Sequence, residues 1–321
     1  GIVAGSDTGA IEMAMWNLLG SKPVEILAWE VFGNDWKKDI IEQLKIPNST
    51  PHTSDFGYLP DLSKVNFNND VIFTWNGTTA GVKVPNADWI PEEREGLVLC
   101  DATSAVFAQD VEWTKLDVVT YSWQKVLGGE AAHGIIVLSP KALSHLENFS
   151  PNWPIPKIFR LTKENKIIEG VFRGETLNTP SMLCVEDYLD VLNWVEKIGG
   201  LSSCIARANK SLSNIESWIE KSDFFDFLCD RAESRSNTSV CLKFNKAEII
   251  NKDEEWQRKL AKEIGSILEE EEVAFDIVNH RSAPPGLRIW TGATVESSDV
   301  EKLLPWIDWA YEKALTNIDS N

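Results

Sequence analysis

The chain has 321 residues, a formal charge of −18 and hydrophobic residues at 43% of its positions. The length suggests about two domains in an ordinary globular protein, and the acidic balance argues against nucleic acid or an anionic membrane as a partner, because binding phosphate groups needs a basic surface. The five cysteines have no CxxC spacing, which favours reduced thiols in a cytoplasmic protein over a disulfide framework or a zinc site.

Strand-like and helix-like segments alternate through the first half of the chain. Helical patterns occur at 8–20, which Gly20 closes, and at 36–46. Apolar, β-branched runs predict strands at 24–30, 70–76, 96–104, 116–123 and 134–139. The alternation predicts an α/β layer with a mostly parallel sheet, whose strands are continuously apolar because both faces are covered. No apolar run approaches the roughly 20 residues that a membrane-spanning helix needs.

The second half of the chain has a different pattern. A proline-rich, irregular stretch at 150–161 leads to a long helix at 178–200 that we interpret as a bridge between domains. Further helices are predicted at 201–221, 253–271 and 297–315, and strands at 239–244 and 286–292. We therefore expect a large α/β domain over residues 1–185 and a smaller α+β domain over residues 186–321. The opening GIVAGSDTGA is typical of a strand end entering a helix, so we expect the chain to begin partway through a domain.

One lysine, Lys125, lies in the stretch TYSWQKVLGGEAAHG, between a predicted inner strand and a glycine-rich turn. Its position alone allows two interpretations: a solvated hairpin residue, or an amine held in a partly dry pocket. An amine that forms a Schiff base with a pyridine cofactor needs a carboxylate at the ring nitrogen, an aromatic ring over the cofactor and a helix N-terminus for its phosphate. Other segments of the sequence are therefore needed to choose between a solvated lysine and an amine held in a pocket.

Other segments of the first half could supply these supports. Asp101 stands at the carboxyl end of a predicted strand, where α/β sheets bind their ligands, although an aspartate there can also cap the next helix. Ser6, Asp7 and Thr8 begin a helix and could hold a phosphate, or could serve only as caps. Thr78 lies in NGTTAG, which is either an ordinary turn or a cofactor contact. Each feature alone is weak evidence for a site.

In this order and spacing, the segments resemble the phosphoserine aminotransferase family over essentially the whole chain, most specifically in SWQKVLGG, LNTP and the C-terminal HR…GLR. That family comprises pyridoxal-phosphate enzymes of the aspartate-aminotransferase fold, in the branch that includes serine–glyoxylate aminotransferase and cysteine desulfurase. The resemblance implies a large domain with a mostly parallel sheet, a small α+β domain, and a homodimer with active sites at the subunit interface. It also implies that a family segment before Gly1 supplies further substrate-binding cations.

The resemblance implies roles for the residues around Lys125. Lys125 would hold pyridoxal 5′-phosphate covalently and transfer protons, and Asp101 would pair with the ring nitrogen. The other implied cofactor contacts are Thr78 at the ring hydroxyl, Gln124 and the backbone amides of Ser6, Asp7 and Thr8 at the phosphate, and Asn178 and Thr179 at the phosphate of the neighbouring subunit. For the aromatic side chain that stacks on the ring it implies Trp36, with Trp29 and Phe32 as nearby alternatives.

The segment NHRSAPPGLRIW carries the implied substrate contacts. The resemblance assigns His280 and Arg281 to a substrate phosphate and Arg288 to the α-carboxylate. A planar guanidinium binds a carboxylate through two hydrogen bonds, and a dianion needs more than one cation. These residues could also be surface charges beside a Pro-Pro turn.

We therefore expect a cytoplasmic aminotransferase of serine biosynthesis that contains no metal and converts glutamate and 3-phosphohydroxypyruvate to 2-oxoglutarate and O-phosphoserine. The alternatives are a relative with an unphosphorylated acceptor, such as serine–glyoxylate aminotransferase, and a non-catalytic relative that keeps the fold as a binding module. The sequence leaves open whether phosphohydroxythreonine is also a substrate. Two residues near the site are interpreted as structural: His133, and Cys100, which should face the side of its strand opposite Asp101.

Overall fold

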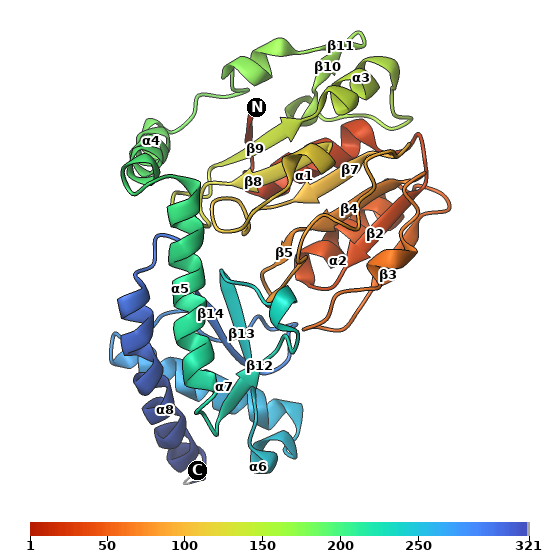
Figure 1. Ribbon diagram of the computed structural model, residues 1–321. Coiled ribbons are helices and arrows are strands. Elements are labelled where there is room, and N and C mark those ends of the chain that lie inside the picture. The colour runs from red at the N-terminus through yellow and green to blue at the C-terminus, as the bar shows by residue number, and fades with distance from the viewer. Residues whose placement is uncertain (320–321) are drawn as a thin grey trace.

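Seven strands form the central sheet of the larger half of the molecule, in the order β1-β9-β8-β7-β4-β2-β3 (Figure 1). The computed structural model describes residues 1–319. The strands are β1 (Ile2–Ala4), β2 (Val24–Ala28), β3 (Thr50–Thr53), β4 (Asp70–Thr74), β7 (Val98–Asp101), β8 (Val118–Ser122) and β9 (His133–Leu138). All run in one direction except β9, which is antiparallel to its neighbours β1 and β8. The prediction of a mostly parallel α/β sheet is confirmed.

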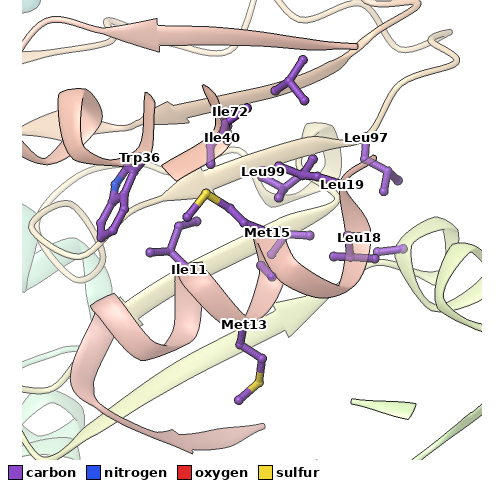
Figure 2. Packing of buried hydrophobic residues seen from close by; sticks show 14 of the residues in the cluster. Ile11, Met13, Met15, Leu18, Leu19, Trp36, Ile40, Ile72, Leu97 and Leu99 are labelled. Atoms are coloured by element: carbon purple, nitrogen blue, oxygen red, sulfur yellow. The ribbon is translucent and has the colours of Figure 1, made fainter. Parts of the chain in front are cut away.

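The two faces of this sheet are buried in different ways. On one face α1 (Ser6–Leu18) lies along β8 and β9, α3 (Pro140–Asn148) contacts α1, and α2 (Val31–Lys38) lies along β2. Ile11, Met15 and Trp36 pack there with Ile72 and Leu99 (Figure 2). The opposite face is buried by the ribbon of β5 (Asn76–Gly77) and β6 (Val82–Lys83) and by irregular segments near 84–90 and 105–116. Burial on both faces explains the continuously apolar strands.

Side chains along β7 alternate between these faces. Leu99 packs in the cluster beneath α1, and Cys100 packs in the cluster on the opposite face. Asp101 follows on the side of Leu99, where its carboxylate meets Trp36 of α2. The prediction that Cys100 faces away from Asp101 is confirmed, and all five cysteines are buried and free.

The C-terminal half has its own core around an antiparallel sheet of β12 (Phe225–Phe227), β13 (Ser239–Phe244) and β14 (Gly286–Trp290). Helices α5 (Leu201–Ile219), α6 (Ala247–Ile250), α7 (Glu254–Glu270) and α8 (Ser297–Asp319) pack around it (Figure 1). The preceding helix α4 (Met182–Lys197) packs with α5 on Val126 and Leu127, just after Lys125. The smaller α+β region is confirmed, whereas the boundary between residues 185 and 186 stays a prediction.

A short segment before and into β13, residues 236–239, joins the two halves, and we call it the seam. Its residues are buried. Within it the side chains of Asn237, Thr238 and Ser239 donate to the backbone carbonyls of Ala108, Ser104 and Thr78 at 2.9, 2.9 and 2.5 Å, respectively. Buried polar groups need such partners, so the seam fixes the small half against the polar edge of the large sheet.

The start of α2 differs from the sequence prediction. The helix begins at Val31 rather than at residue 36, because the Glu30 side chain caps it by accepting a hydrogen bond from the Gly33 N–H at 2.7 Å. After Lys38 the chain continues as a π-helical turn over Asp39–Gln43. Glutamate is not among the preferred N-cap residues, so the sequence did not mark this start.

Other elements were missed or shifted. Helix α3 was not predicted, although it begins at Pro140 after a capping Ser139, a combination typical of helix starts. The bridging helix begins at Met182 rather than at 178. The strand end expected at the start of the chain is β1, whereas the short strands β3 and β12 and the ribbon of β10 (Thr162–Lys163) and β11 (Lys166–Ile167) were missed. Within residues 1–319, no helix is both long and apolar enough to cross a membrane.

Asp70, the first residue of β4, carries a buried carboxyl group. Its Oδ1 accepts a hydrogen bond from the Leu97 N–H at 2.8 Å, while Oδ2 has no hydrogen-bond partner within the described part of the chain. Burial raises the pKa of Asp70 to about 6, against the opposing effects of the Leu97 hydrogen bond and of Lys22 and Lys141. Between the ordinary pKa of 3.8 and this value, the unfolded chain is ionised while the folded chain keeps the proton.

We predict that Asp70 makes folding less favourable as the pH rises. Because the pKa of Asp70 is higher in the folded state than in the unfolded state, the folded chain has its full free energy of unfolding below the unfolded-state pKa. Part of that free energy is lost as the pH rises through the folded-state pKa and the buried carboxyl ionises. The free energy of unfolding of Asp70→Asn, relative to that of the parent, should therefore increase by roughly 1 to 3 kcal/mol between pH 4 and pH 7. Urea denaturation at several pH values measures this. The exposed Glu92→Gln serves as the control, and a difference that stays constant with pH would contradict the prediction.

Candidate active site

A cavity of about 100 Å³ lies where β2, β4, β7 and β8 end and where α1 and α2 begin. Predicted site residues line it: Ser6, Asp7, Thr8, Trp36, Thr78, Asp101, Gln124 and Lys125. A larger, mostly apolar cavity of about 330 Å³ lies between β1 and residues 157–177, but it contains none of them. The carboxyl ends of parallel strands are where α/β sheets bind ligands, so we take the smaller, polar cavity as the candidate site.

Lys125 lies in the turn that follows β8. Its backbone carbonyl accepts a hydrogen bond from the Gly128 N–H at 3.0 Å, and its Nζ lies 5.9 Å from the centroid of the Trp290 ring. Burial and the charge of Arg288 lower the pKa of Lys125, although the nearby carboxyls of Asp101, Glu30 and Asp7 oppose the shift. A lowered pKa increases the share of neutral amine, which is the nucleophilic form.

The carboxylate of Asp101 is held through both oxygens. The Thr103 N–H donates to Oδ1 at 3.0 Å, and the Trp36 indole N–H donates to Oδ2 at 3.3 Å. Asp7, on the first turn of α1, lies beside it. Burial, and next the charge of Asp101, raise the pKa of Asp7 well above its ordinary value. Asp7 therefore favours the neutral form, which avoids a second negative charge beside the Asp101 carboxyl group.

The three candidate aromatic side chains occupy different environments. Trp29 is fully buried, and its indole N–H donates to the Val82 carbonyl at 3.3 Å. Trp36 is 4% exposed and packs in the core with Ile11 (Figure 2), with only its edge toward Asp101. Phe32, one helical turn before Trp36, is 38% exposed and lines the cavity. Phe32 has the largest free ring surface of the three.

Polar groups line the cavity at the start of α1 and around Thr78. Gly5 and Ser6 adopt left-handed backbone conformations, with φ of 85° and 58°, as the chain enters α1. The Gln124 amide donates to the Ser6 hydroxyl at 2.9 Å, and the first-turn amides of a helix lack partners within the helix. On the other side the Thr78 hydroxyl donates to the Ser104 hydroxyl at 2.9 Å. A helix N-terminus with such neighbours can bind an anion.

The remaining predicted residues do not line the cavity. Asn178 and Thr179 are exposed ahead of α4. Arg288 on β14 pairs with Asp276 at 3.1 Å, while its charge also reaches Lys125. His280 is half-buried, and its pKa is lowered by burial and then by Arg281 and Arg288.

Sequence reasoning missed some residues of the cavity. They are Glu30, Phe32, Thr74, Asn76, Thr103 and Ser104, of which Phe32 had been weighed only as an alternative to Trp36. Most of them stand at or just beyond the ends of predicted strands, and that position was the available signal. His133 is buried, lies in a tilted contact with Trp123 at 4.9 Å between ring centroids, and does not line the cavity. Within residues 1–319 no group of three or more His, Cys, Asp or Glu side chains is arranged to hold a metal ion.

Comparison with known proteins shows strong similarity to phosphoserine aminotransferases. No family model matches the chain. A phosphoserine aminotransferase of Methanosarcina mazei is 53% identical over 312 residues, which are 97% of this chain and 82% of that protein. The structure of a phosphoserine aminotransferase from Cytophaga hutchinsonii superposes with a TM-score of 0.79 at 19% identity, covering 96% of this chain and 82% of that one.

A ureidoglycine–glyoxylate aminotransferase from Bacillus subtilis is also similar in structure, with a TM-score of 0.75 at 14% identity, covering 98% of this chain and 79% of that one. Enzymes with different acceptors thus share this fold. The fold alone therefore does not select the substrate.

Proposed function

The chain belongs to the phosphoserine aminotransferase family, and from this premise we propose that it transfers the amino group of glutamate to 3-phosphohydroxypyruvate, giving O-phosphoserine and 2-oxoglutarate for serine biosynthesis. The observation that carries the proposal is the 53% identity over 97% of the chain, together with a cavity where Lys125 and Asp101 meet. All five cysteines are buried and free, which supports a cytoplasmic enzyme.

Pyridoxal 5′-phosphate fits the residues of this cavity. They offer an amine with a lowered pKa, a carboxylate held in place and the N-terminus of α1. The buried Thr74 Oγ1, which has no hydrogen-bond partner in the described structure, also lies there. When bound, this cofactor withdraws electrons from the bonds at the substrate α-carbon.

Lys125 holds the cofactor and moves the proton of the substrate α-carbon. Both roles need a neutral amine, which the lowered pKa supplies. The turn that carries Lys125 is anchored by Val126 and Leu127 against α4 and α5, so the chain holds the backbone while the long side chain can still move.

Asp101 keeps the ring nitrogen protonated. Its carboxylate cannot turn freely, because Thr103 and Trp36 hold its two oxygens. The neutral form of Asp7 beside it leaves a single negative charge to meet the ring cation.

Phe32, rather than Trp36, covers the face of the cofactor ring. This assignment replaces the initial expectation, because Trp36 is packed in the core and uses its indole N–H to orient Asp101. Phe32 lies at the cavity with its ring partly free, and stacking on an aromatic side chain contributes roughly 0.5 to 1.5 kcal/mol beyond burial.

We predict different effects for the two aromatic residues. Phe32→Ala should weaken the affinity for pyridoxal phosphate about tenfold, since both stacking and apolar contact are lost. Trp36→Phe should keep that affinity within about threefold and instead lower the turnover rate, since it removes one hydrogen bond to Asp101. Equilibrium titration of the cofactor-free protein measures the affinity. If Trp36→Phe weakens binding more than Phe32→Ala does, the assignment is wrong.

The cofactor phosphate lies at the start of α1. Its partners are Gln124, the Ser6 hydroxyl and the backbone amides of Ser6, Asp7 and Thr8. Asn178 and Thr179 of a second subunit complete this site in a homodimer. Their exposure supports the arrangement, as do the neighbouring exposed apolar residues Leu177, Met182 and Leu183 at 52%, 60% and 69%, because an apolar surface of this kind favours burial against another protein.

The substrate lies between the cavity and the small half. Arg288 binds the α-carboxylate, which every substrate carries, and its effect on the pKa of Lys125 supports a position next to the reacting amine. His280 and Arg281 bind the distal phosphate: Arg281 lies close enough to lower the pKa of His280, and a phosphate that approaches both side chains would favour the protonated imidazole. The charge of Asp35, on α2 in the large half, also acts on His280 and opposes the lowering of its pKa.

We predict that Arg281→Ala raises the KM for phosphoserine about tenfold to a hundredfold, because a charge-assisted hydrogen bond is lost. The glutamate half-reaction should be affected less, whereas Arg288→Ala should damage both half-reactions alike. The exposed Arg231→Ala is the matched control. Steady-state kinetics of each half-reaction give the ratio of effects, and equal losses for both substrates in Arg281→Ala would refute this division of roles.

The overall proposal is tested with purified protein, pyridoxal phosphate and 2-oxoglutarate. Phosphoserine should be a far better amino donor than serine, and Lys125→Ala should lose both turnover and the visible absorbance of the lysine-bound cofactor. The preparation should sediment as a dimer. Faster turnover of serine with glyoxylate would favour an unphosphorylated acceptor, and absence of cofactor binding would favour a non-catalytic binding module.

A further inference from the structure

Glu30 is a buried carboxyl that the proposed mechanism does not use. It follows the end of β2, lines the cavity and is fully buried, and within residues 1–319 it forms no ion pair shorter than 4 Å. Its Oε1 accepts a hydrogen bond from the Gly33 N–H at 2.7 Å, and its Oε2 accepts one from the Thr79 hydroxyl at 2.9 Å. Such an unpaired carboxyl is unfavourable in a protein interior unless its hydrogen bonds compensate.

These hydrogen bonds connect two separate parts of the cavity wall. Gly33 belongs to the first turn of α2, and Thr79 belongs to the turn after β5. The Thr79 hydroxyl also accepts a hydrogen bond from the Val31 N–H at 3.1 Å. Two hydrogen bonds therefore link Thr79 to the segment at the start of α2. We call the group Glu30, Val31, Gly33 and Thr79 the Glu30 strap. It joins the start of α2, which carries Phe32, to the turn that carries Thr78.

The strap lies in a tightly packed region. A Cβ atom on Gly77 would approach the Glu30 Cγ to 2.7 Å and the Trp29 Nε1 to 2.6 Å. Neither wall can therefore move toward the other. A connection that also prevents them from separating fixes the width of the cavity at this point.

We propose that Glu30 is a positioning residue that holds Phe32 and Thr78 at a fixed separation across the cavity, and so sets how tightly pyridoxal phosphate is clamped. This inference rests on the proposed function, because it takes the cofactor to lie between these two side chains. Glu30 itself is not a catalytic residue, since its oxygens are used by the strap.

The strap tolerates both protonation states of Glu30. Burial raises the pKa of Glu30 to about 7, with the hydrogen bonds from Gly33 and Thr79 acting in the opposite direction and the charge of Asp101 adding to the rise. The charge of Glu30 also acts to raise the pKa of Lys125 and of Cys241. A protonated Oε2 can donate to the Thr79 hydroxyl, while Oε1 still accepts from Gly33. A glutamine makes the same pattern and reproduces the neutral state.

The test measures the dissociation constant of pyridoxal phosphate and the visible circular dichroism of the saturated protein, which reports how rigidly the ring is oriented. Glu30→Ala should weaken binding about tenfold to a hundredfold, because two buried hydrogen bonds are lost, and should reduce the dichroism. Glu30→Gln, measured at pH 6, should stay within about threefold of the parent in affinity and keep the dichroism. Asp70→Asn, a buried carboxyl at the other end of the sheet, is the matched control and should change neither quantity.

Thr79→Val covers the case in which Glu30→Ala does not fold. It removes one hydroxyl with little change of volume and should weaken binding about threefold to tenfold. Unchanged affinity and dichroism in Glu30→Ala or Thr79→Val would overturn the inference, and so would a Glu30→Gln variant as weak as Glu30→Ala. A parent chain that fails to bind pyridoxal phosphate would instead contradict the proposed function.

Discussion

The buried negative charge of Asp101 is the constraint around which the site is arranged. No lysine or arginine pairs with it at salt-bridge distance among residues 1–319, so hydrogen bonds from Thr103 and Trp36 carry its stabilisation. The cavity holds two more carboxyls, Asp7 and Glu30, and burial raises the pKa of both. Protonation of these neighbours avoids a cluster of like charges in a low-dielectric interior. The site is thus suited to a single cation facing Asp101.

Lys125 gains its properties from both halves of the molecule. The large sheet supplies the strand end from which it projects, and α4 and α5 anchor the turn that follows. From the small half, Trp290 lies beside its amine and Arg288 helps to lower its pKa. Lys125 and Arg288 therefore come close only when the two cores are docked, although each core could be recognised separately in the sequence.

Much of the fold could be predicted because its signals are local. Continuously apolar runs located the inner strands, and the alternation along β7 placed Cys100 and Asp101 on opposite faces. The stacking aromatic could not be assigned this way. Phe32 and Trp36 stand four residues apart on the same face of α2 and both line the cavity, and only the fold shows that Trp36 also packs in the core while Phe32 keeps more of its surface exposed.

Glu30 and the pair Asn178–Thr179 illustrate two further limits of sequence reasoning. A glutamate at a strand end has no distinctive pattern, and its role follows from Gly33 and Thr79, of which Thr79 is distant in the chain. Asn178 and Thr179 are exposed in this chain, so their proposed contact depends on a second copy. The local pattern of a single segment does not show contacts with distant residues or with a second copy of the chain.

The seam restricts how the enzyme can move. Because residues 237–239 donate hydrogen bonds to Ala108, Ser104 and Thr78, the small half is not a freely hinged lid. A rotation about α4 or α5 would either break these buried hydrogen bonds or carry the Thr78 turn with it and change the shape of the cavity that Thr78 lines. Any rotation of the small half that keeps these hydrogen bonds must therefore leave residues 236–239 in place against the large half.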